Sequence, residues 1–258
     1  MRYLLQYFNW WKKATRRPNV RDERLRNFIY EILPAPVPEN IQKIIQKARL
    51  HYASKTREFP SSVEFGAGSR WALGRRSIAS IARKTAIPER RGRILYNTVR
   101  WLQPSRVLEL GTGLGISTLY IALAAPEARI LTMDGHPDLI SWARNTFTSL
   151  GIKNVEVLQA SFDEGLPDAL DDLGGVDFAW IDGDHQYLST IRNVDMILSK
   201  SKPPVVLGID DIRWSGEMTA AWYQLCSNPY LRLNLDFFYM GLCFCINYPI
   251  HETLCLQL

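Results

Sequence analysis

The sequence predicts an α/β fold whose centre is a mostly parallel sheet with helices on both faces. From residue 106 onward, short apolar runs alternate with amphipathic stretches of helical length, which is typical of successive β-α-β units. Two apolar runs near the C-terminus are separated by only three residues, and so short a connection permits only an antiparallel pair. The 258 residues are enough for one large α/β domain or two small ones.

The first hundred residues are predicted to be mainly helical. Apolar residues recur at helical spacing in four stretches: 3–11, 25–33, 41–51 and 77–102. A proline-rich segment at 33–38 separates the second stretch from the third, because proline ends a helix. Residues 61–75 contain three glycines and are expected to form a loop.

The remainder of the chain predicts seven strands with helices between them. The expected strands are 107–110, 130–133, 155–158, 178–181, 205–209, 231–238 and 242–248. The expected helices are 116–125, 138–150, 164–173, 187–198 and 217–227. This arrangement gives five parallel strands followed by an antiparallel terminal pair.

Charge is divided unevenly along the chain. Residues 1–104 contain 22 of the 31 Lys and Arg but 7 of the 26 Asp and Glu, whereas residues 105–258 contain 9 basic and 19 acidic side chains. The basic part has three interpretations: a cap that faces the acidic part, a nucleic-acid-binding region, or a first helix that lies on an anionic membrane. No pattern of a known RNA-binding module occurs, and no run of about eighteen apolar residues predicts a membrane-spanning helix.

The four cysteines favour a reducing compartment. Cys243 and Cys245 alternate within an apolar run, as buried strand residues do, while Cys226 and Cys255 lie on either side of them. Cys/His pairs at the spacing of a zinc finger are absent from the sequence. Because the N-terminus also lacks the order of a signal peptide, we expect core cysteines and a cytoplasmic protein.

A glycine-rich turn follows the first strand of the sheet. The sequence Glu109-Leu-Gly-Thr-Gly-Leu-Gly115 runs directly into a helix, so the glycines allow a sharp turn and bring bare main chain close to a ligand. Position 116 is Ile, so the G-x-G-x-x-G spacing of dinucleotide-binding enzymes is not met. The acidic residue before the first glycine suits a cationic ligand, and Asp134 at the end of the second strand is placed to accept from ribose hydroxyls.

These residues resemble the class I S-adenosylmethionine-dependent methyltransferases, over about residues 94–248. The motif E-L-G-T-G-L-G with a strand-end acid downstream carries the resemblance. Residues 181–187 (I-D-G-D-H-Q-Y) are similar to the O-methyltransferase-like branch, and residues 209–214 and 238–242 to an uncharacterised bacterial group within it. The resemblance implies a Rossmann-like, doubly wound sheet of seven strands in the order 3-2-1-4-5-7-6, with only strand 7 antiparallel.

Two regions are expected on this basis: a helical, basic N-terminal cap (1–93) and the methyltransferase domain (94–258). The F-G-A-G-S-R stretch (65–70) belongs to the cap, where it forms either a lid over the cofactor or a simple turn. Aromatic residues at 214, 222 and 237–239 are expected in the core and the pocket wall.

The resemblance also implies which residues bind S-adenosylmethionine. The set is Glu109, Gly111, Thr112, Gly113, Gly115, Ser117, Asp134, Gly135, Ser161, Phe162, Asp163 and Asp182. Glu109, Gly111 and Gly113 would contact the methionine end and Asp134 the ribose. Residues 161–163 would hold the adenine, and Asp182 would face the reaction centre.

Metal assistance and proton transfer are two further expectations. In relatives resembling catechol O-methyltransferase, carboxylates at the positions of Asp182, Asp210 and Asp211 bind a divalent cation, and oxygen ligands suit Mg²⁺. The alternative for the last two is a capped turn or a salt bridge to Arg213. His185 is a candidate base that would deprotonate an oxygen nucleophile, or it would simply cap the following helix.

The expected function is methylation of a small-molecule oxygen, with or without a divalent cation. Two alternatives remain: an RNA or protein methyltransferase directed by the basic cap, and a catalytically silent homologue that binds the cofactor. A homodimer is also compatible with the sequence. The methyl acceptor is not determined, because acceptor pockets vary with loops and cap rather than with the sheet.

Overall fold

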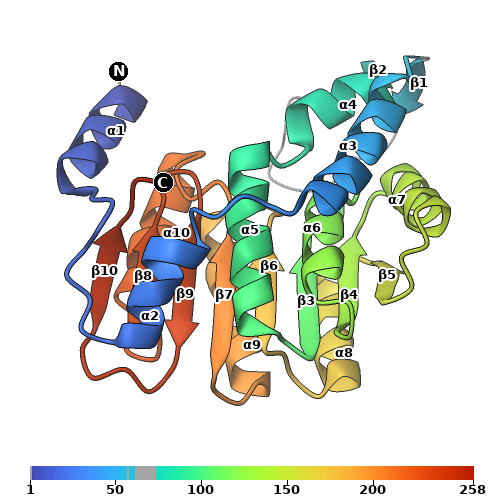
Figure 1. Cartoon of the computed structure of the whole chain (residues 1–258). Coiled ribbons are helices and arrows are strands. Elements are labelled where there is room, and N and C mark those ends of the chain that lie inside the picture. Colours follow the sequence, from blue (N-terminus) through green and yellow to red (C-terminus); the bar gives the residue numbers. More distant parts are fainter. Residues whose placement is uncertain (1, 57, 62–73) are drawn as a thin grey trace.

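The computed structural model describes residues 2–56, 58–61 and 74–258 of the chain (Figure 1). Its centre is an eight-stranded sheet in the order β10-β8-β9-β7-β6-β3-β4-β5. Only β9 is antiparallel to its neighbours in this sheet. The strands are β3 (Arg106–Leu110), β4 (Arg129–Asp134), β5 (Val155–Gln159), β6 (Phe178–Ile181), β7 (Val205–Ile209), β8 (Leu233–Asp236), β9 (Gly241–Cys245) and β10 (Glu252–Cys255).

The predicted order of seven strands is confirmed, and β10 extends it by an eighth strand at the edge. β10 pairs in parallel with β8, from Glu252 opposite Leu233 to Cys255 opposite Asp236. Its four residues are too few and too polar to be recognised as a strand. Long-range pairing creates it: the amide N–H of Thr15 also donates to the Cys255 carbonyl at 3.0 Å.

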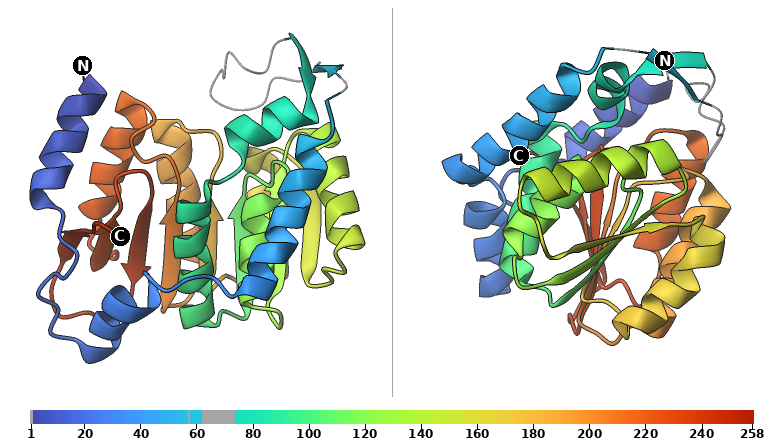
Figure 2. Two further views of the ribbon diagram at one scale, coloured as in Figure 1. Left: turned by 45° about the horizontal axis from the view of Figure 1, so that its top comes forward. Right: turned by 90° about the vertical axis from the view of Figure 1, so that its right-hand side faces the viewer.

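Helices cover both faces of the sheet, as predicted (Figures 1 and 2). One face carries α2, η1, α3 and α4 together with α5, α6 and α7, and the other face carries α8, α9 and α10. Helix α1 lies at the edge of the sheet, where it contacts β8, β10 and α10. The helices are α1 (Arg2–Lys13), α2 (Glu23–Asn27), the π-helix η1 (Phe28–Ile32), α3 (Glu39–Ala53), α4 (Ile78–Thr85), α5 (Glu89–Leu102), α6 (Ile116–Ala124), α7 (Pro137–Ser149), α8 (Phe162–Leu173), α9 (Tyr187–Lys200) and α10 (Gly216–Cys226).

Two local predictions need correction. The helical stretch 77–102 is two helices, because Pro88 interrupts the helix between α4 and α5. Pro88 occupies the N-cap position of α5. The expected loop 61–75 begins and ends in short antiparallel strands, β1 (Glu58–Ser61) and β2 (Gly74–Ser77). The two strands are too short to show a periodic pattern.

The predicted boundary between residues 93 and 94 falls inside α5, and the N-terminal helices pack on the sheet. Phe28 is fully buried and stacks on Trp101 of α5, with ring centroids 4.1 Å apart. Trp10 of α1 is buried and donates through its indole N–H to the Asp236 carbonyl at 3.1 Å. One hydrophobic core therefore contains both N-terminal and sheet residues.

Other features of the described residues bear on the sequence predictions. No helix in these ranges has the length and apolar character needed to cross a bilayer. Cys243 and Cys245 are buried in β9, as expected, and Cys226 and Cys255 are partly buried. Pro137 occupies the first turn of α7, where its missing N–H costs no hydrogen bond.

Candidate functional site

The candidate site lies where the carboxyl ends of β3, β4, β6 and β7 meet, at the upper edge of the sheet in Figure 1. Gly111 follows β3 with φ of 104°, a conformation open to glycine. A Cβ added there would lie 2.1 Å from the carbonyl oxygen of Asp182, which follows β6. The Gly111 amide N–H donates to the Met133 carbonyl in β4 at 2.8 Å. Glycine at this position therefore allows three strand ends to approach closely.

Asp134 and Gly113 form an open cradle at the end of β4. The Gly113 amide N–H donates to Asp134 Oδ2 at 2.8 Å, and the His136 amide N–H donates to Oδ1 at 2.9 Å. Burial raises the pKa of Asp134, and it outweighs the opposite effect of these N–H groups and that of Gly135. A Cβ added at Gly113, where φ is 50°, would meet nothing within 4 Å. The loop thus leaves space beside a fixed carboxylate.

Glu109 is completely buried beneath this loop. The hydroxyls of Thr118 and Thr132 donate to its Oε2 at 2.5 and 2.6 Å. The Ser117 hydroxyl also faces the carboxyl group, but Oε1 has no hydrogen bond of normal geometry among the described residues. Burial raises the pKa of Glu109 to about 7, against the effect of the three hydroxyls. An unsatisfied buried oxygen of this kind suits a cationic group.

Thr112 and Gly115 shape the loop from within. Thr112 is buried, and its Oγ1 lies 2.7 Å from Thr132 Oγ1. Gly115 has φ of 77°, and a Cβ there would lie 2.4 Å from the Phe147 ring of α7. Both residues therefore pack the loop against its surroundings. Whether Thr112, Gly115 and Ser117 also contact a cofactor stays a prediction.

Tyr52 of α3 anchors the same loop and was missed by the sequence analysis. Its side chain is fully buried, and its hydroxyl lies 2.7 Å both from the Leu114 carbonyl, to which it donates, and from Thr146 Oγ1 in α7. The predicted helical stretch 41–51 ended one residue before Tyr52, whereas α3 extends to Ala53. Its partners lie 62 and 94 residues further along the chain, so only the fold brings them together.

Asp182 and His185 follow β6, as the sequence predicts. His185 Nε2 lies 3.9 Å from Asp182 Oδ1. The Asp182 side chain is 19% exposed and the His185 side chain 25%. Burial and the nearby carboxylates of Asp210 and Asp211 raise the pKa of Asp182 well above its usual range. Burial lowers the pKa of His185. A neutral imidazole of this kind can accept a proton near neutral pH.

Asp210 and Asp211 follow β7 and share a partner that sequence reasoning did not find. Arg91 Nη1 of α5 donates to Asp210 Oδ1 at 2.7 Å and to Asp211 Oδ1 at 2.9 Å. Burial lowers the pKa of Arg91, but the two carboxylates outweigh this effect and raise it. Burial raises the pKa of Asp210 to about 6, against the opposing effect of Arg91. The only sequence signal for Arg91 was its place in a basic helical stretch.

The three carboxylates do not fit a divalent cation in this arrangement. Mg²⁺ and Ca²⁺ need oxygen ligands at about 2.0–2.6 Å, and Arg91 Nη1 already lies against the Oδ1 atoms of both Asp210 and Asp211. No cluster of three metal-ligating side chains is present among residues 2–56, 58–61 and 74–258. The alternative of a salt bridge between this pair and Arg213 is also not formed, because Arg213 pairs with Asp236 instead.

The predicted adenine-binding residues lie at the start of α8. Ser161 caps the helix: its Oγ accepts from the Glu164 amide and donates to Glu164 Oε2 at 2.8 Å. The Phe162 ring lies where a Cβ on Gly183 would meet it, 2.6 Å away, so it adjoins the end of β6. Asp163 is exposed and pairs with Arg192 of α9. Contacts of these residues with adenine stay a prediction.

Aromatic side chains and unusual backbone border the carboxylates. The Arg91 guanidinium carbon lies 5.6 Å from the ring centroid of Tyr239. The Tyr3 side chain of α1 approaches the side chain of Tyr239. Trp214 is exposed, with its ring centroid 6.3 Å from that of His185. Positive φ values, which are costly outside glycine, occur at Asp184, His185, Asp211 and Phe238. Such backbone is characteristic of functional sites.

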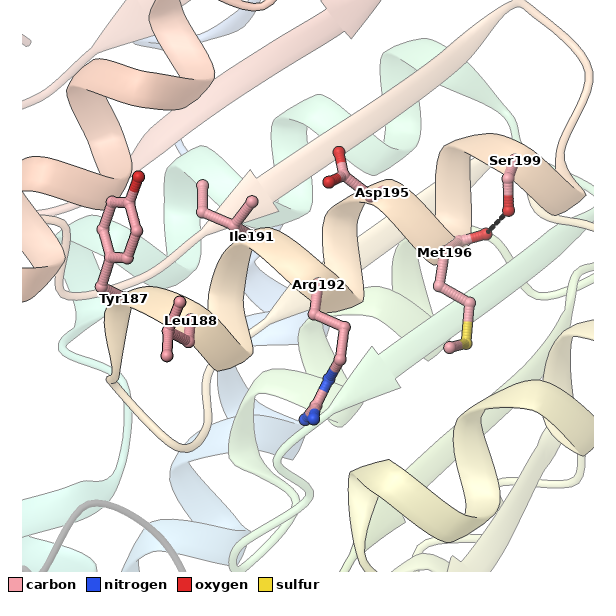
Figure 3. A pocket seen from close by; sticks show the side chains of 7 residues that line it. All are labelled: Tyr187, Leu188, Ile191, Arg192, Asp195, Met196 and Ser199. Carbon is pink, nitrogen blue, oxygen red and sulfur yellow. Dashed lines mark hydrogen bonds between the residues drawn. The ribbon is translucent and has the colours of Figure 1, made fainter.

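A shallow depression on α9 lies away from these residues. Figure 3 shows its lining side chains along one helix. They are Tyr187, Leu188, Ile191, Arg192, Asp195, Met196 and Ser199. We do not assign it to the candidate site. The predicted F-G-A-G-S-R lid or turn (65–70) falls outside the described residues.

Comparison with known proteins supports the sequence resemblance. Residues 108–212 match a family of methyltransferase domains. The chain is 36% identical over 86 residues to the release factor glutamine methyltransferase of Escherichia coli, which covers 33% of this chain and 28% of that protein. It is 34% identical over 116 residues to a probable O-methyltransferase of Mycobacterium tuberculosis, covering 42% and 50%. The chain therefore matches half or less of these relatives' lengths.

Solved structures show the same fold over most of the chain. The O-methyltransferase TomG from Streptomyces achromogenes, in complex with S-adenosylmethionine, has a TM-score of 0.59 at 17% identity over 88% of this chain and all (100%) of its own. The O-methyltransferase from Bacillus cereus, in complex with S-adenosylhomocysteine, has a TM-score of 0.56 at 15% identity, covering 83% and 93%. The strand order is therefore that of the Rossmann-like methyltransferase fold, and residues 108–212 are similar to a methyltransferase domain.

Proposed function

We propose that this protein transfers a methyl group from S-adenosylmethionine to an oxygen atom of a small molecule. The observation that carries the proposal is the open cradle at Gly113, where an added Cβ would meet nothing within 4 Å, beside the fixed carboxylate of Asp134. In this proposal Asp134 accepts from the ribose hydroxyls. The buried Glu109, whose Oε1 is unsatisfied, stabilises the positive methionine end electrostatically.

The cofactor supplies a methyl group already activated by its sulfonium, so the protein has mainly to align and deprotonate the acceptor. His185 is the candidate base, because its lowered pKa keeps the imidazole neutral and able to take the hydroxyl proton at Nε2. The nearby carboxylates of Asp211 and Asp184, which favour the protonated imidazole, would stabilise the imidazolium that forms, while Asp182 lies 3.9 Å from Nε2. Structural neighbours described as O-methyltransferases, aligned over 83% and 88% of the chain, favour oxygen as the acceptor atom.

Cofactor binding is tested first, by isothermal titration calorimetry with S-adenosylmethionine and S-adenosylhomocysteine. We expect stoichiometric binding by the wild-type protein and at least tenfold weaker binding by Asp134→Asn. Asp138→Asn is the matched control, because Asp138 is exposed on α7 four residues away and should leave the affinity unchanged. No measurable binding by wild-type protein would overturn the proposal.

Acceptor class is tested with cofactor carrying an isotopically labelled methyl group. Hydroxylated small molecules, total RNA and purified release factor are offered separately, since the E. coli relative is a release factor glutamine methyltransferase. We expect label in small molecules, with loss in His185→Gln. Label in RNA or protein alone would assign the acceptor to the alternative class, and binding without any transfer would favour a catalytically silent homologue.

A further inference from the structure

Arg91 places a fixed positive charge beside the strand-end carboxylates Asp210 and Asp211. It lies on α5, before the sheet begins, whereas the family match covers residues 108–212. One nitrogen, Nη1, donates to both Asp210 and Asp211 at 2.7 and 2.9 Å. Asp210 is almost completely buried, with 3% of its surface exposed, so its charge needs a partner within the protein.

The guanidinium is held from more than one side. Tyr239, in the turn between β8 and β9, presents its ring to Arg91 at 5.6 Å from the centroid, a distance at which cations are attracted to aromatic faces. The Arg91 side chain is only 20% exposed. Three separate elements therefore converge on one cation: α5, the loop after β7 and the β8–β9 turn.

We propose that Arg91 occupies the position that a divalent cation would otherwise need between the strand-end carboxylates, so that this chain positions its acceptor without a metal. A cation bound to the Oδ1 atoms of Asp210 and Asp211 would have to lie nearer to those atoms than Nη1 does now. It would therefore collide with the guanidinium and be repelled by its charge. Arg91 and a metal are mutually exclusive in this geometry.

Arg91 is a positioning residue in this proposal, acting through the two carboxylates. By pairing with them it keeps the loop after β7 in place, including Asp211 with its positive φ of 51°. In the proposed reaction, Asp182 and His185, rather than the paired Asp210 and Asp211, would face the incoming hydroxyl. The role in acceptor positioning rests on the proposed methyl transfer, but exclusion of a metal does not, so the two can be tested separately.

The test measures Mn²⁺ binding by electron paramagnetic resonance, without cofactor or acceptor. We expect wild-type protein and Arg91→Lys to bind no Mn²⁺ stoichiometrically, because each keeps a cation between the carboxylates. We expect Arg91→Gln to bind one Mn²⁺ per chain, and Arg91→Gln combined with Asp210→Asn to lose it. A purely structural role for Arg91 would not predict a metal site that appears on its removal.

Two results would overturn the proposal: stoichiometric Mn²⁺ binding by wild-type protein that Asp210→Asn abolishes, or a folded Arg91→Gln variant without Mn²⁺ binding. If Arg91→Gln does not fold, the wild-type and Arg91→Lys titrations still decide between exclusion and binding. Cofactor calorimetry on the same samples reports the proposed function independently. Once an acceptor is known, wild-type turnover should be unchanged by EDTA, whereas a loss of more than tenfold would contradict metal-free positioning.

Discussion

Arg213 and Asp236 form a bidentate ion pair in the interior, with Nη1 2.9 Å from Oδ1 and Nη2 2.6 Å from Oδ2. Asp236 also accepts from the Trp222 indole at 2.9 Å and from the Phe238 amide at 2.9 Å. Arg213 further donates to the Phe238 carbonyl at 2.9 Å. The pair thus joins the loop after β7, which contains Asp211, to the turn that presents Tyr239.

Removal of Asp236 should destabilise the fold strongly. Asp236→Ala leaves the Arg213 guanidinium buried without its counter-charge, and loss of one partner from a buried pair costs about 3–5 kcal/mol. Urea unfolding followed by circular dichroism measures the change. Asp171→Ala is the control, because Asp171 pairs with Lys200 on the surface and should cost less than about 1 kcal/mol. Equal losses in the two variants would contradict this assignment.

Gly113→Ala should weaken cofactor binding more than it weakens the fold. Its φ of 50° and the open space beside it mean that alanine causes modest backbone strain of about 1 kcal/mol and projects a methyl group into the cradle. We expect at least tenfold weaker S-adenosylmethionine binding by calorimetry. Gly151→Ala is the matched control: φ is 71°, and nothing lies within 4 Å. That variant should show a similar stability loss with unchanged affinity; a parallel loss of affinity would count against the cradle.

Tyr52→Phe should loosen the glycine loop from outside it. The change removes a buried hydroxyl that bonds to Leu114 and Thr146, and we expect a loss of about 1–2 kcal/mol in unfolding free energy together with weaker cofactor binding. Tyr30→Phe is the comparison, since the Tyr30 hydroxyl donates to the Pro18 carbonyl, a partner outside the loop. Only the Tyr52 variant should change the calorimetric affinity.

The buried Glu109 should make stability fall as pH rises. Its pKa is raised from 4.5 to about 7, so between these values the folded state retains a proton that the unfolded state has lost. The free energy of unfolding should decrease by up to about 3 kcal/mol across this window and be unaffected by Glu109 outside it. In Glu109→Gln the decrease measured by urea unfolding between pH 4.5 and pH 7.5 should become smaller by this amount, and the rest is due to Asp134, Asp182 and Asp210, whose pKa values are also raised. An unchanged pH profile in the variant would show that Glu109 is not the group responsible.

The strands and their order could be predicted from the sequence because the patterns that indicate them are local. Apolar runs and helical spacing determine β3 to β9 and the helices between them, and glycines at 111, 113 and 115 mark the turn after β3. β10 was not readable, because its four residues become a strand only by pairing with β8. The break between α4 and α5 lies at Pro88 and was not predicted, because the apolar residues of 77–102 keep helical spacing across it.

The sequence by itself determined the carboxylates at the candidate site: Asp134, Asp182, Asp210 and Asp211 each follow an apolar run, so parallel pairing brings them to one edge. What neutralises and surrounds them was decided by tertiary structure alone. Arg91 precedes Asp210 by 119 residues, and Tyr52 precedes Thr146 by 94. Periodicity can assign such residues to a helix, but it cannot identify the partner that a helix meets when it packs across the sheet. That packing pairs Asp210 and Asp211, two of the predicted metal ligands, with Arg91.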